Sequence, residues 1–144
     1  MAVPATFSLE IVTPDKLLIR EDAVAEAQVP GSQGSFGILP GHTPLLATLK
    51  IGEMWFRKGQ ERTYLAIAGG FVEVLPDRVT VLAQIAERAH DIDVGRAEAA
   101  KQRAEERLAR PSADIDLERA RAALFKSLIR IQVASKARNR VGVH

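Results

Sequence analysis

Hydrophobic and polar residues alternate with a period of two over roughly the first 86 residues of the chain. Phe7, Leu9 and Ile11 open this pattern, with polar side chains between them. Further short apolar runs lie at 24–29, 54–56, 64–67, 71–75 and 79–82. Glycine- and proline-containing turns separate the runs, so the pattern predicts many short strands that form an antiparallel β-sandwich or flattened barrel.

Two of the turns carry a more specific expectation. The step Leu75-Pro76-Asp77-Arg78-Val79 predicts a hairpin between two strands. Gly69-Gly70 resembles part of a phosphate-binding loop, but neither the Lys-Ser/Thr pair nor the helix that such a loop needs follows it. We therefore expect a bulge or a close approach between strands at this position.

From residue 91 onward the apolar spacing changes to three and four residues, which is the period of a helix. One face of a first helix is marked by Ala97, Ala100, Ala104 and Leu108. Pro111 ends this helix, because proline disfavours helix at the residue before it. A second helix is expected to begin near Asp114 or Asp116. Its predicted apolar stripe consists of Leu117, Ala120, Leu124, Leu128 and Ile131.

The short loop between the two helices predicts that they form an antiparallel hairpin. An alanine face buries little apolar area, at about 0.8 kcal/mol per buried CH₂ group, so we expect weak packing and a hairpin that opens. The predicted fold class is α+β. Residues 1–88 are expected to form the β-sandwich and residues 89–144 the helical hairpin.

Composition restricts the classes of function. The 144 residues include no cysteine, which excludes disulfides and thiolate metal sites, and no apolar run has the length of a membrane span. The N-terminus lacks the features of a signal peptide, so any membrane association is expected to be through a partner. His42, His90 and His144 are scattered, and no catalytic triad or metal-binding spacing is visible, which argues against an enzyme.

Charge is distributed unevenly along the chain. Residues 1–90 carry 8 basic and 10 acidic side chains, whereas residues 91–144 carry 12 and 8. No acidic residue follows Glu118, so the C-terminal end favours an acidic partner or a phosphate, or is simply a solvated basic face. Aromatic residues do not interleave with these cations, which argues against nucleic acid as the partner.

Several arginines have the spacing of a phosphate-binding cluster. Arg96 and Arg103 are seven residues apart and share a helix face, as do Arg119 and Arg130 with Lys126 between them. Guanidinium groups from two helices would hold a triphosphate, with Asp93 and Glu87 accepting hydrogen bonds from an exocyclic amine. Asp93 is equally suited to cap the first helix, and both interpretations remain open.

One segment resembles a known family. The run Gly34-Ser35-Phe36-Gly37-Ile38-Leu39-Pro40-Gly41-His42-Thr43-Pro44-Leu45, preceded by Gly31-Ser32, is similar to a loop-and-strand motif of the epsilon subunits of bacterial and chloroplast-type ATP synthases. We expect the segment to be a shaped surface loop, and His42 at its tip to have a structural or contact role. The family implies that this loop faces the ring of membrane c subunits, with Ser35 and His42 as contacts. Ser35 differs from the acidic residue of some members.

A second motif extends the resemblance to about residues 6–136. Ile92-Asp93-x-x-Arg96-Ala97 is similar to the I/L-D-x-x-R-A element of ATP-binding epsilon subunits. The resemblance implies a nucleotide site formed by Glu87, Ile92, Asp93, Arg96, Ala97, Arg103, Arg119, Lys126 and Arg130. Lys126 replaces an arginine of the nucleotide-binding members, and Gly95 weakens the first helical turn by roughly 1 kcal/mol relative to alanine.

The resemblance implies a non-catalytic subunit of the rotary central stalk that couples proton-driven rotation of the c-ring to ATP synthesis. Its sandwich would bind the gamma subunit and the ring, and its helices would reach the alpha and beta subunits and inhibit ATP hydrolysis. The expected beta-subunit contacts are Arg119, Arg121, Lys126 and Arg130. No cofactor is expected other than regulatory ATP, and the expected location is the cytoplasmic face of a bacterial inner membrane. The alternative is a stand-alone nucleotide-sensing or adaptor module.

Overall fold

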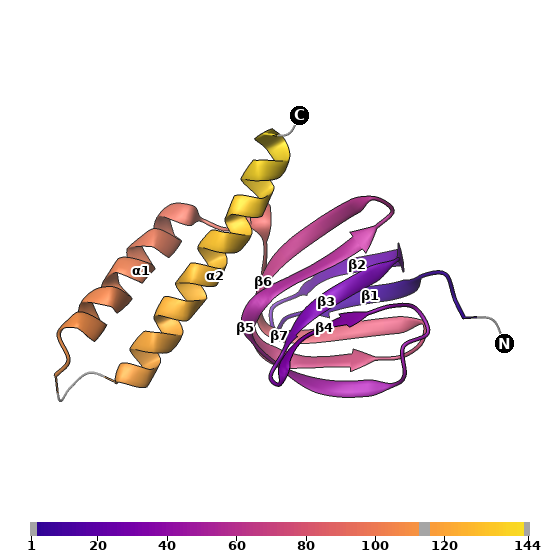
Figure 1. The fold of residues 1–144 in the computed structure, drawn as a ribbon, viewed down its shortest axis with the longest axis horizontal. Coiled ribbons are helices and arrows are strands. Elements are labelled where there is room, and N and C mark those ends of the chain that lie inside the picture. The colour runs from indigo at the N-terminus through magenta and orange to yellow at the C-terminus, as the bar shows by residue number, and fades with distance from the viewer. Residues whose placement is uncertain (1–2, 113–115, 143–144) are drawn as a thin grey trace. The chain divides into compact units, whose positions relative to one another are not determined.

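The computed structural model describes residues 3–112 and 116–142, with side-chain environments up to residue 137 (Figure 1). The chain divides into two compact units, Met1–Glu87 and Arg88–His144. The first unit contains the strands β1 (Phe7–Val12), β2 (Leu17–Val24), β3 (Glu26–Gly31), β4 (Gly34–Ile38), β5 (Leu45–Lys58), β6 (Glu61–Val74) and β7 (Arg78–Arg88, which crosses the division). The second contains the short 3-10 helix η1 (Ala89–Asp91) and the helices α1 (Val94–Ala109) and α2 (Leu117–Gly142).

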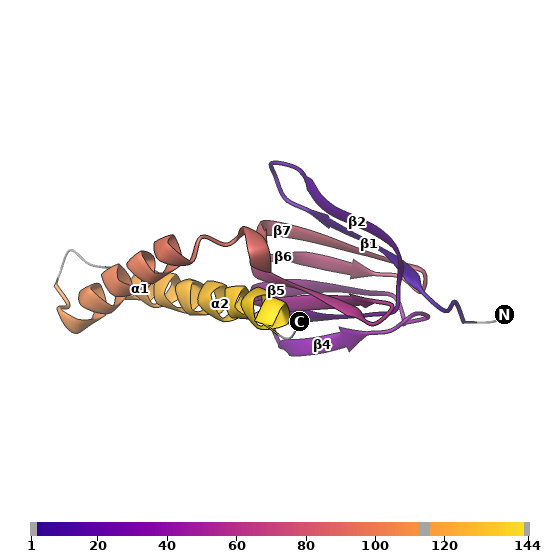
Figure 2. The same cartoon turned by 90° about the horizontal axis from the view of Figure 1, so that it is seen from above.

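The seven strands form one sheet in the order β2-β1-β7-β6-β5-β3-β4, with β2 and β4 at its margins (Figure 2). The longest pairing joins β5 and β6 in antiparallel register from Leu45↔Val74 to Lys58↔Glu61. Near the tip of β5 the sheet folds back on itself, where Lys58 Nζ lies 2.9 Å from Glu21 Oε2 of β2. The predicted sandwich is therefore confirmed.

One pairing differs from the predicted antiparallel arrangement. β1 pairs with β7 in parallel, in the register Ser8↔Arg78 to Val12↔Leu82. Hairpin turns determine only how neighbouring strands pair, whereas a parallel pair joins strands that are distant in sequence. The period-two pattern that predicted each strand carries no information about which distant strand lies beside it.

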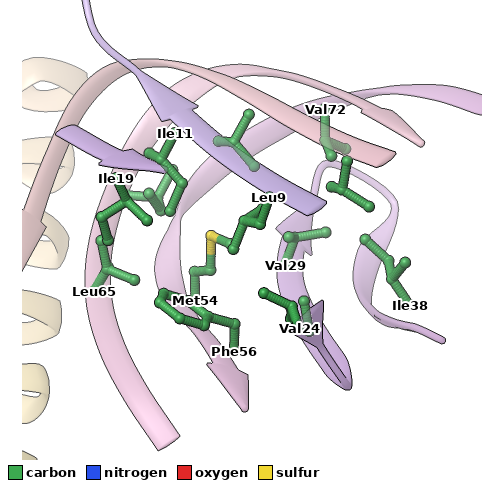
Figure 3. Close-up of a cluster of buried hydrophobic side chains, with 14 of the residues drawn as sticks. Leu9, Ile11, Ile19, Val24, Val29, Ile38, Met54, Phe56, Leu65 and Val72 are labelled. Atoms are coloured by element: carbon green, nitrogen blue, oxygen red, sulfur yellow. The ribbon is translucent and has the colours of Figure 1, made fainter. Parts of the chain in front are cut away.

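The core lies inside the folded sheet and is made of the alternate residues that the sequence pattern predicted. Phe7, Leu9 and Ile11 of β1 are buried, while the residues between them are half-buried. Figure 3 shows Leu9, Met54 and Val29 converging from three strands. Because the side chains of a strand alternate between its two faces, one face of each strand supplies the core and the other faces outward.

The two specific turn predictions are confirmed. Leu75 and Arg78 exchange both backbone hydrogen bonds, at 2.8 Å and 3.4 Å, so Pro76 and Asp77 form the turn of a β6–β7 hairpin. Gly70 has a φ of 121° and lies against β7: a Cβ placed on it would approach Ala83 Cα to 2.8 Å and would come closer still to Leu82 O. The glycine pair therefore permits a close approach between strands, and the phosphate-loop interpretation is wrong.

About half of the segment 34–45, which was expected to be a surface loop, forms strands. Gly34–Ile38 is β4, at the margin of the sheet, and only the residues between Ile38 and Leu45 form the loop. Glycine is poorly suited to a strand interior, but β4 makes its backbone pairs with β3 alone, so the cost is small. In the loop, Gly41 has a φ of 83°, and its N–H donates to Pro76 O at 2.7 Å. This hydrogen bond ties the loop to the β6–β7 turn.

Both helices begin at an aspartate. Asp93 Oδ1 accepts a hydrogen bond from Arg96 N at 3.1 Å, and Asp116 Oδ1 accepts one from Arg119 N at 3.1 Å. Each bond satisfies one of the N–H groups that a helix leaves unpaired at its start. The predicted second start, near Asp116, is therefore confirmed, and Asp114 lies outside the described residues.

The predicted apolar stripe of α2 is partly wrong. Ala120 is buried, but Leu128 is 41% exposed and Leu117, Leu124 and Ile131 are only half-buried. The other buried side chains of α2 are Ser127, Val133 and Ala134. A hairpin of two helices covers only a narrow line on each helix, and small side chains occupy that line because they allow the helix backbones to approach closely.

Candidate functional site

The two helices of the hairpin pack through small residues, and α1 and α2 lie side by side in Figure 1. Apart from Val133, the buried residues in the described part of each helix lie seven apart, and we call this set the contact line: Ala97 and Ala104 of α1, with Ala120, Ser127 and Ala134 of α2. Seven residues are close to two helical turns, so the members of each set share one helix face. Ser127 is the polar member, and its Oγ donates to Ala123 O at 2.8 Å, which satisfies the buried hydroxyl.

Four of the predicted phosphate-binding cations stand directly beside the contact line. Arg96 and Arg103 each precede a buried alanine of α1, and on α2 Arg119 precedes Ala120 and Lys126 precedes Ser127. One residue corresponds to a rotation of about 100° around a helix, so all four are displaced from the line in the same rotational sense. In an antiparallel pair, the same sense of rotation places the side chains on the same side. We call Arg96, Arg103, Arg119 and Lys126 the cationic face.

These cations are available for a ligand. Arg96, Arg103 and Arg119 are exposed and Lys126 is half-buried, and within the described residues none of the four forms an ion pair. Arg130 lies three residues beyond Ser127 on the same side of α2, but it is half-buried and already has an interaction of its own. Helix geometry therefore places cations from both helices on one side of the hairpin.

Three other residues of the predicted nucleotide site, Ile92, Asp93 and Ala97, have structural roles. Asp93 caps α1, as its alternative interpretation required, and its side chain is exposed. Ile92 and Ala97 are 7% and 0% exposed, so they belong to the packed interior and not to an open site. Glu87 is the last residue of the sheet unit, so it does not belong to the hairpin. Arg121, predicted to contact a beta subunit, follows Ala120 and so lies on the opposite side of the hairpin.

The predicted contact residues of the sandwich lie on and beside β4. Ser35 is exposed on the strand itself, and His42 is half-buried in the loop that follows. His42 Nδ1 lies 2.6 Å from Thr43 O, so the imidazole is held by the backbone carbonyl of the next residue. Among the described residues, no group of three histidines and carboxylates is arranged to hold a metal ion.

An exposed apolar strip on the sandwich was not predicted from the sequence. Leu46 of β5, Phe71 of β6 and Leu82 of β7 are 70%, 51% and 51% exposed. Phe71 of β6 pairs with Thr48 of β5, and Leu46 lies two residues before Thr48 on the same strand. Leu75 and Arg78 form the first pair of the β6–β7 hairpin, so the fourth residue before Leu75, Phe71, lies opposite the fourth residue after Arg78, Leu82. The contact between Gly70 and Ala83, the next pair, agrees with this register. We call these three residues the apolar strip.

A signal for this strip exists in the sequence. Phe71 and Leu82 occupy outward positions in strands whose inward positions, such as Val72 and Val81, are already apolar. An apolar residue on both faces of a strand indicates either burial on both sides or an interaction surface. The apolar runs 71–75 and 79–82 therefore contained this information.

Comparison with known proteins places both units in one family. The model of the ATP synthase delta/epsilon chain β-sandwich domain matches residues 6–89, and the model of the long α-helix domain of the same chains matches residues 90–135. Together the two matches span most of the chain. The chain belongs to the epsilon-chain family of ATP synthases.

Relatives and solved structures agree with this assignment. The ATP synthase epsilon chain of Syntrophobacter fumaroxidans is 50% identical over 128 residues, which cover 89% of this chain and 95% of that one. The epsilon chain of Koribacter versatilis is 56% identical over 103 residues, covering 72% of each. A chain of the Euglena gracilis mitochondrial ATP synthase (OSCP/F1/c-ring) shares the fold with a TM-score of 0.78 at 23% identity, covering 89% of this chain and 82% of that one.

Membership in the epsilon family identifies a non-catalytic subunit of the ATP synthase central stalk. Neither of the two long helices, as far as their residues are described, is apolar enough over a sufficient length to cross a membrane. Membership in this family makes the stand-alone adaptor alternative unnecessary.

Proposed function

We propose that the sandwich binds the gamma subunit and the c-ring, and that the hairpin restrains ATP hydrolysis by the assembled enzyme. The subunit would then be peripheral, at the cytoplasmic face of the membrane, and held there only through the complex. The observation that carries the proposal is the contrast between the two units. The sandwich has a continuous apolar core, whereas the hairpin is held by small side chains.

The apolar strip is the surface proposed to bind the gamma subunit. Three large apolar side chains that lie together on adjacent strands cost free energy in water, and burying them against a partner recovers about 25 cal/mol per Å² of apolar surface. Ser35 and His42 belong to the other proposed contact, with the c-ring. Hydrogen bonds fix the backbone of the loop that contains His42, and both Ser35 and His42 are polar. Such a surface suits a contact with polar loops of the ring.

A binding experiment tests the role of the apolar strip. Phe71→Glu should abolish or strongly weaken copurification of the chain with gamma, because the carboxylate would lose its hydration on binding. Leu17→Glu is the matched control, since Leu17 is 48% exposed on the marginal strand β2 and the substitution adds the same charge. Equal copurification of Phe71→Glu and the unaltered chain would show that the strip is not the gamma contact.

The hairpin is the element proposed to inhibit hydrolysis. Its helices separate at small cost, because alanine and serine side chains on the contact line bury much less area than leucines would. α2 also presents Phe125 and Leu128, which are 46% and 41% exposed. Phe125 lies on the face of α2 opposite the contact line, and Leu128 lies beside that line. When α2 extends toward the alpha and beta subunits, these apolar side chains and the cations Arg119, Arg121, Lys126 and Arg130 would meet that partner surface.

Regulatory ATP is proposed to bind the cationic face of the closed hairpin. The four cations come from both helices, so a triphosphate that contacts all of them favours the closed state. A ligand that binds only one state stabilises it by RT ln(1 + [L]/Kd), about 2.7 kcal/mol at one hundred times Kd. Such a stabilisation would release inhibition when ATP is abundant.

Calorimetric titration of the full chain with MgATP tests this part of the proposal. Binding should be weakened by Arg96→Gln and retained by Arg121→Gln, which removes the same charge from the opposite side of the hairpin. No heat at millimolar MgATP would instead leave Asp93 and Arg96 with the capping role alone. Equal weakening by both variants would point to the general positive charge of the hairpin.

A further inference from the structure

Arginines continue along α1 beyond the residues of the cationic face. Arg107 follows Arg103 by four residues on the same side of α1, and Arg110 is the C-cap residue that ends the helix. Together with Glu106 and Ala109 they line an open hollow of about 560 Å³. We call this hollow the arginine cleft.

The charges of the arginine cleft are not balanced. All five lining residues are exposed, and in the described part of the chain none of the three arginines has an ion-pair partner. Glu106 is the single carboxylate in the cleft, against three guanidinium groups. Like charges at a spacing of four residues repel each other on a helix surface, and Arg103 and Arg107 form such a pair on α1. An anion between these side chains would relieve the repulsion.

Guanidinium groups select the kind of anion. Each offers a planar fork of N–H donors that matches the oxygens of a phosphate group, and three forks around one hollow suit a ligand with more than one phosphate. The hollow lies within the usual volume range of small-molecule sites. We propose that the arginine cleft binds a small multivalent phosphate anion of the pyrophosphate class.

This site is separate from the proposed nucleotide site. The two share Arg103, but Arg107 and Arg110 lie toward the C-terminal end of α1, whereas Asp93 and Arg96 lie at its start. With a rise of 1.5 Å per residue, Arg96 and Arg110 are about 21 Å apart along the helix axis. The arginine cleft needs no adenine-binding group, so its ligand is recognised by phosphates alone and the proposal does not rest on regulation by ATP.

Titration of the full chain with pyrophosphate, followed by calorimetry and by backbone NMR, tests the proposal. Pyrophosphate should bind with its largest chemical-shift changes at residues 103–110, and orthophosphate should bind more weakly at equal ionic strength. The double variant Arg107→Gln/Arg110→Gln should weaken pyrophosphate binding about tenfold or more, through the loss of charge-assisted hydrogen bonds. Glutamine is a good helix former, so α1 should persist, which circular dichroism checks.

Three comparisons complete the experiment. Arg121→Gln, on the opposite side of the hairpin, should leave pyrophosphate binding unchanged, and Arg96→Gln should weaken it less than the double variant does. Adenosine without phosphates should cause no shifts in the cleft. The proposal is overturned by the absence of pyrophosphate binding, by equal weakening in Arg121→Gln, or by a larger loss in Arg96→Gln. The last result would place the anion at the start of α1, in the proposed nucleotide site.

Discussion

Replacing Ser127 by leucine should open the helical hairpin while leaving the sandwich intact. Ser127 is 3% exposed and lies at the middle of the α2 side of the contact line, between Ala120 and Ala134. A leucine adds a branched side chain where only a small group fits, so the helices must move apart. Because the sandwich has its own core of buried residues, its stability should not depend on this position.

The size of the effect follows from the packing of the site. Inserting extra methylene groups into a well-packed position costs typically 1–3 kcal/mol. At about 2 kcal/mol the equilibrium between closed and open hairpin shifts roughly 30-fold toward the open form, since each 1.4 kcal/mol corresponds to a factor of ten. The amide hydrogens of α1 and α2 should then exchange with solvent about 30-fold faster.

Native-state hydrogen exchange followed by mass spectrometry measures this shift, and the sandwich strands serve as the internal reference. Ser127→Ala is the matched control, because it removes the hydroxyl that donates to Ala123 O and keeps the small size. Alanine has the higher helix propensity, so this variant should exchange at the original rate or more slowly. Unchanged exchange in Ser127→Leu, or equal acceleration in both variants, would refute the view that close packing of small residues holds the hairpin.

Substitutions at three further positions test local features. Asp93→Ala should destabilise the first turn of α1 by about 1 kcal/mol through loss of the cap at Arg96 N, whereas Asp93→Asn should retain most of it, as thermal melting of the helical signal would show. Gly70→Ala should severely destabilise the sandwich in urea denaturation, because its Cβ would collide with the backbone at Leu82 and Ala83, and a near-native midpoint would contradict that contact. Ala23→Gly should raise the free energy of unfolding by roughly 0.5–1 kcal/mol, and with it the urea midpoint, because Ala23 has a φ of 61°; a lower midpoint would show that the flexibility of glycine outweighs this strain.

Much of the fold could be predicted from local patterns. The alternation at Phe7, Leu9 and Ile11 identifies a strand with one buried face, and Asp93 and Pro111 delimit a helix, because each feature acts within a few residues. The parallel pairing of β1 with β7 could not be predicted in the same way. It depends on how strands more than sixty residues apart share one core, which no local period records.

The same distinction between local and long-range information applies to the candidate sites. Spacing alone identified the cations Arg96, Arg103, Arg119 and Lys126, since helix geometry determines which of them share a face. Their common side in the hairpin became visible only with the contact line, because α2 buries Ser127 where the apolar pattern favoured Leu128. The preference for large apolar residues in a core misled the prediction, since two helices in close contact need small ones.

The apolar strip shows the converse error. Phe71 and Leu82 were expected to belong to ordinary strands, and the structure leaves about half of each side chain in water. Large apolar side chains that lie together on an exposed face are typical of interaction surfaces. Sequence patterns that assign every apolar residue to a core therefore overlook interaction surfaces.

The proposed division of labour is that the sandwich assembles into the complex while the hairpin restrains hydrolysis. The most direct test is the ATP hydrolysis rate of the assembled enzyme with and without residues 91–144, with the subunit composition measured on the same preparations. Our account predicts a higher rate after deletion, with gamma, alpha and beta subunits and the c-ring present in full. An unchanged or lower rate in a complete complex would contradict it.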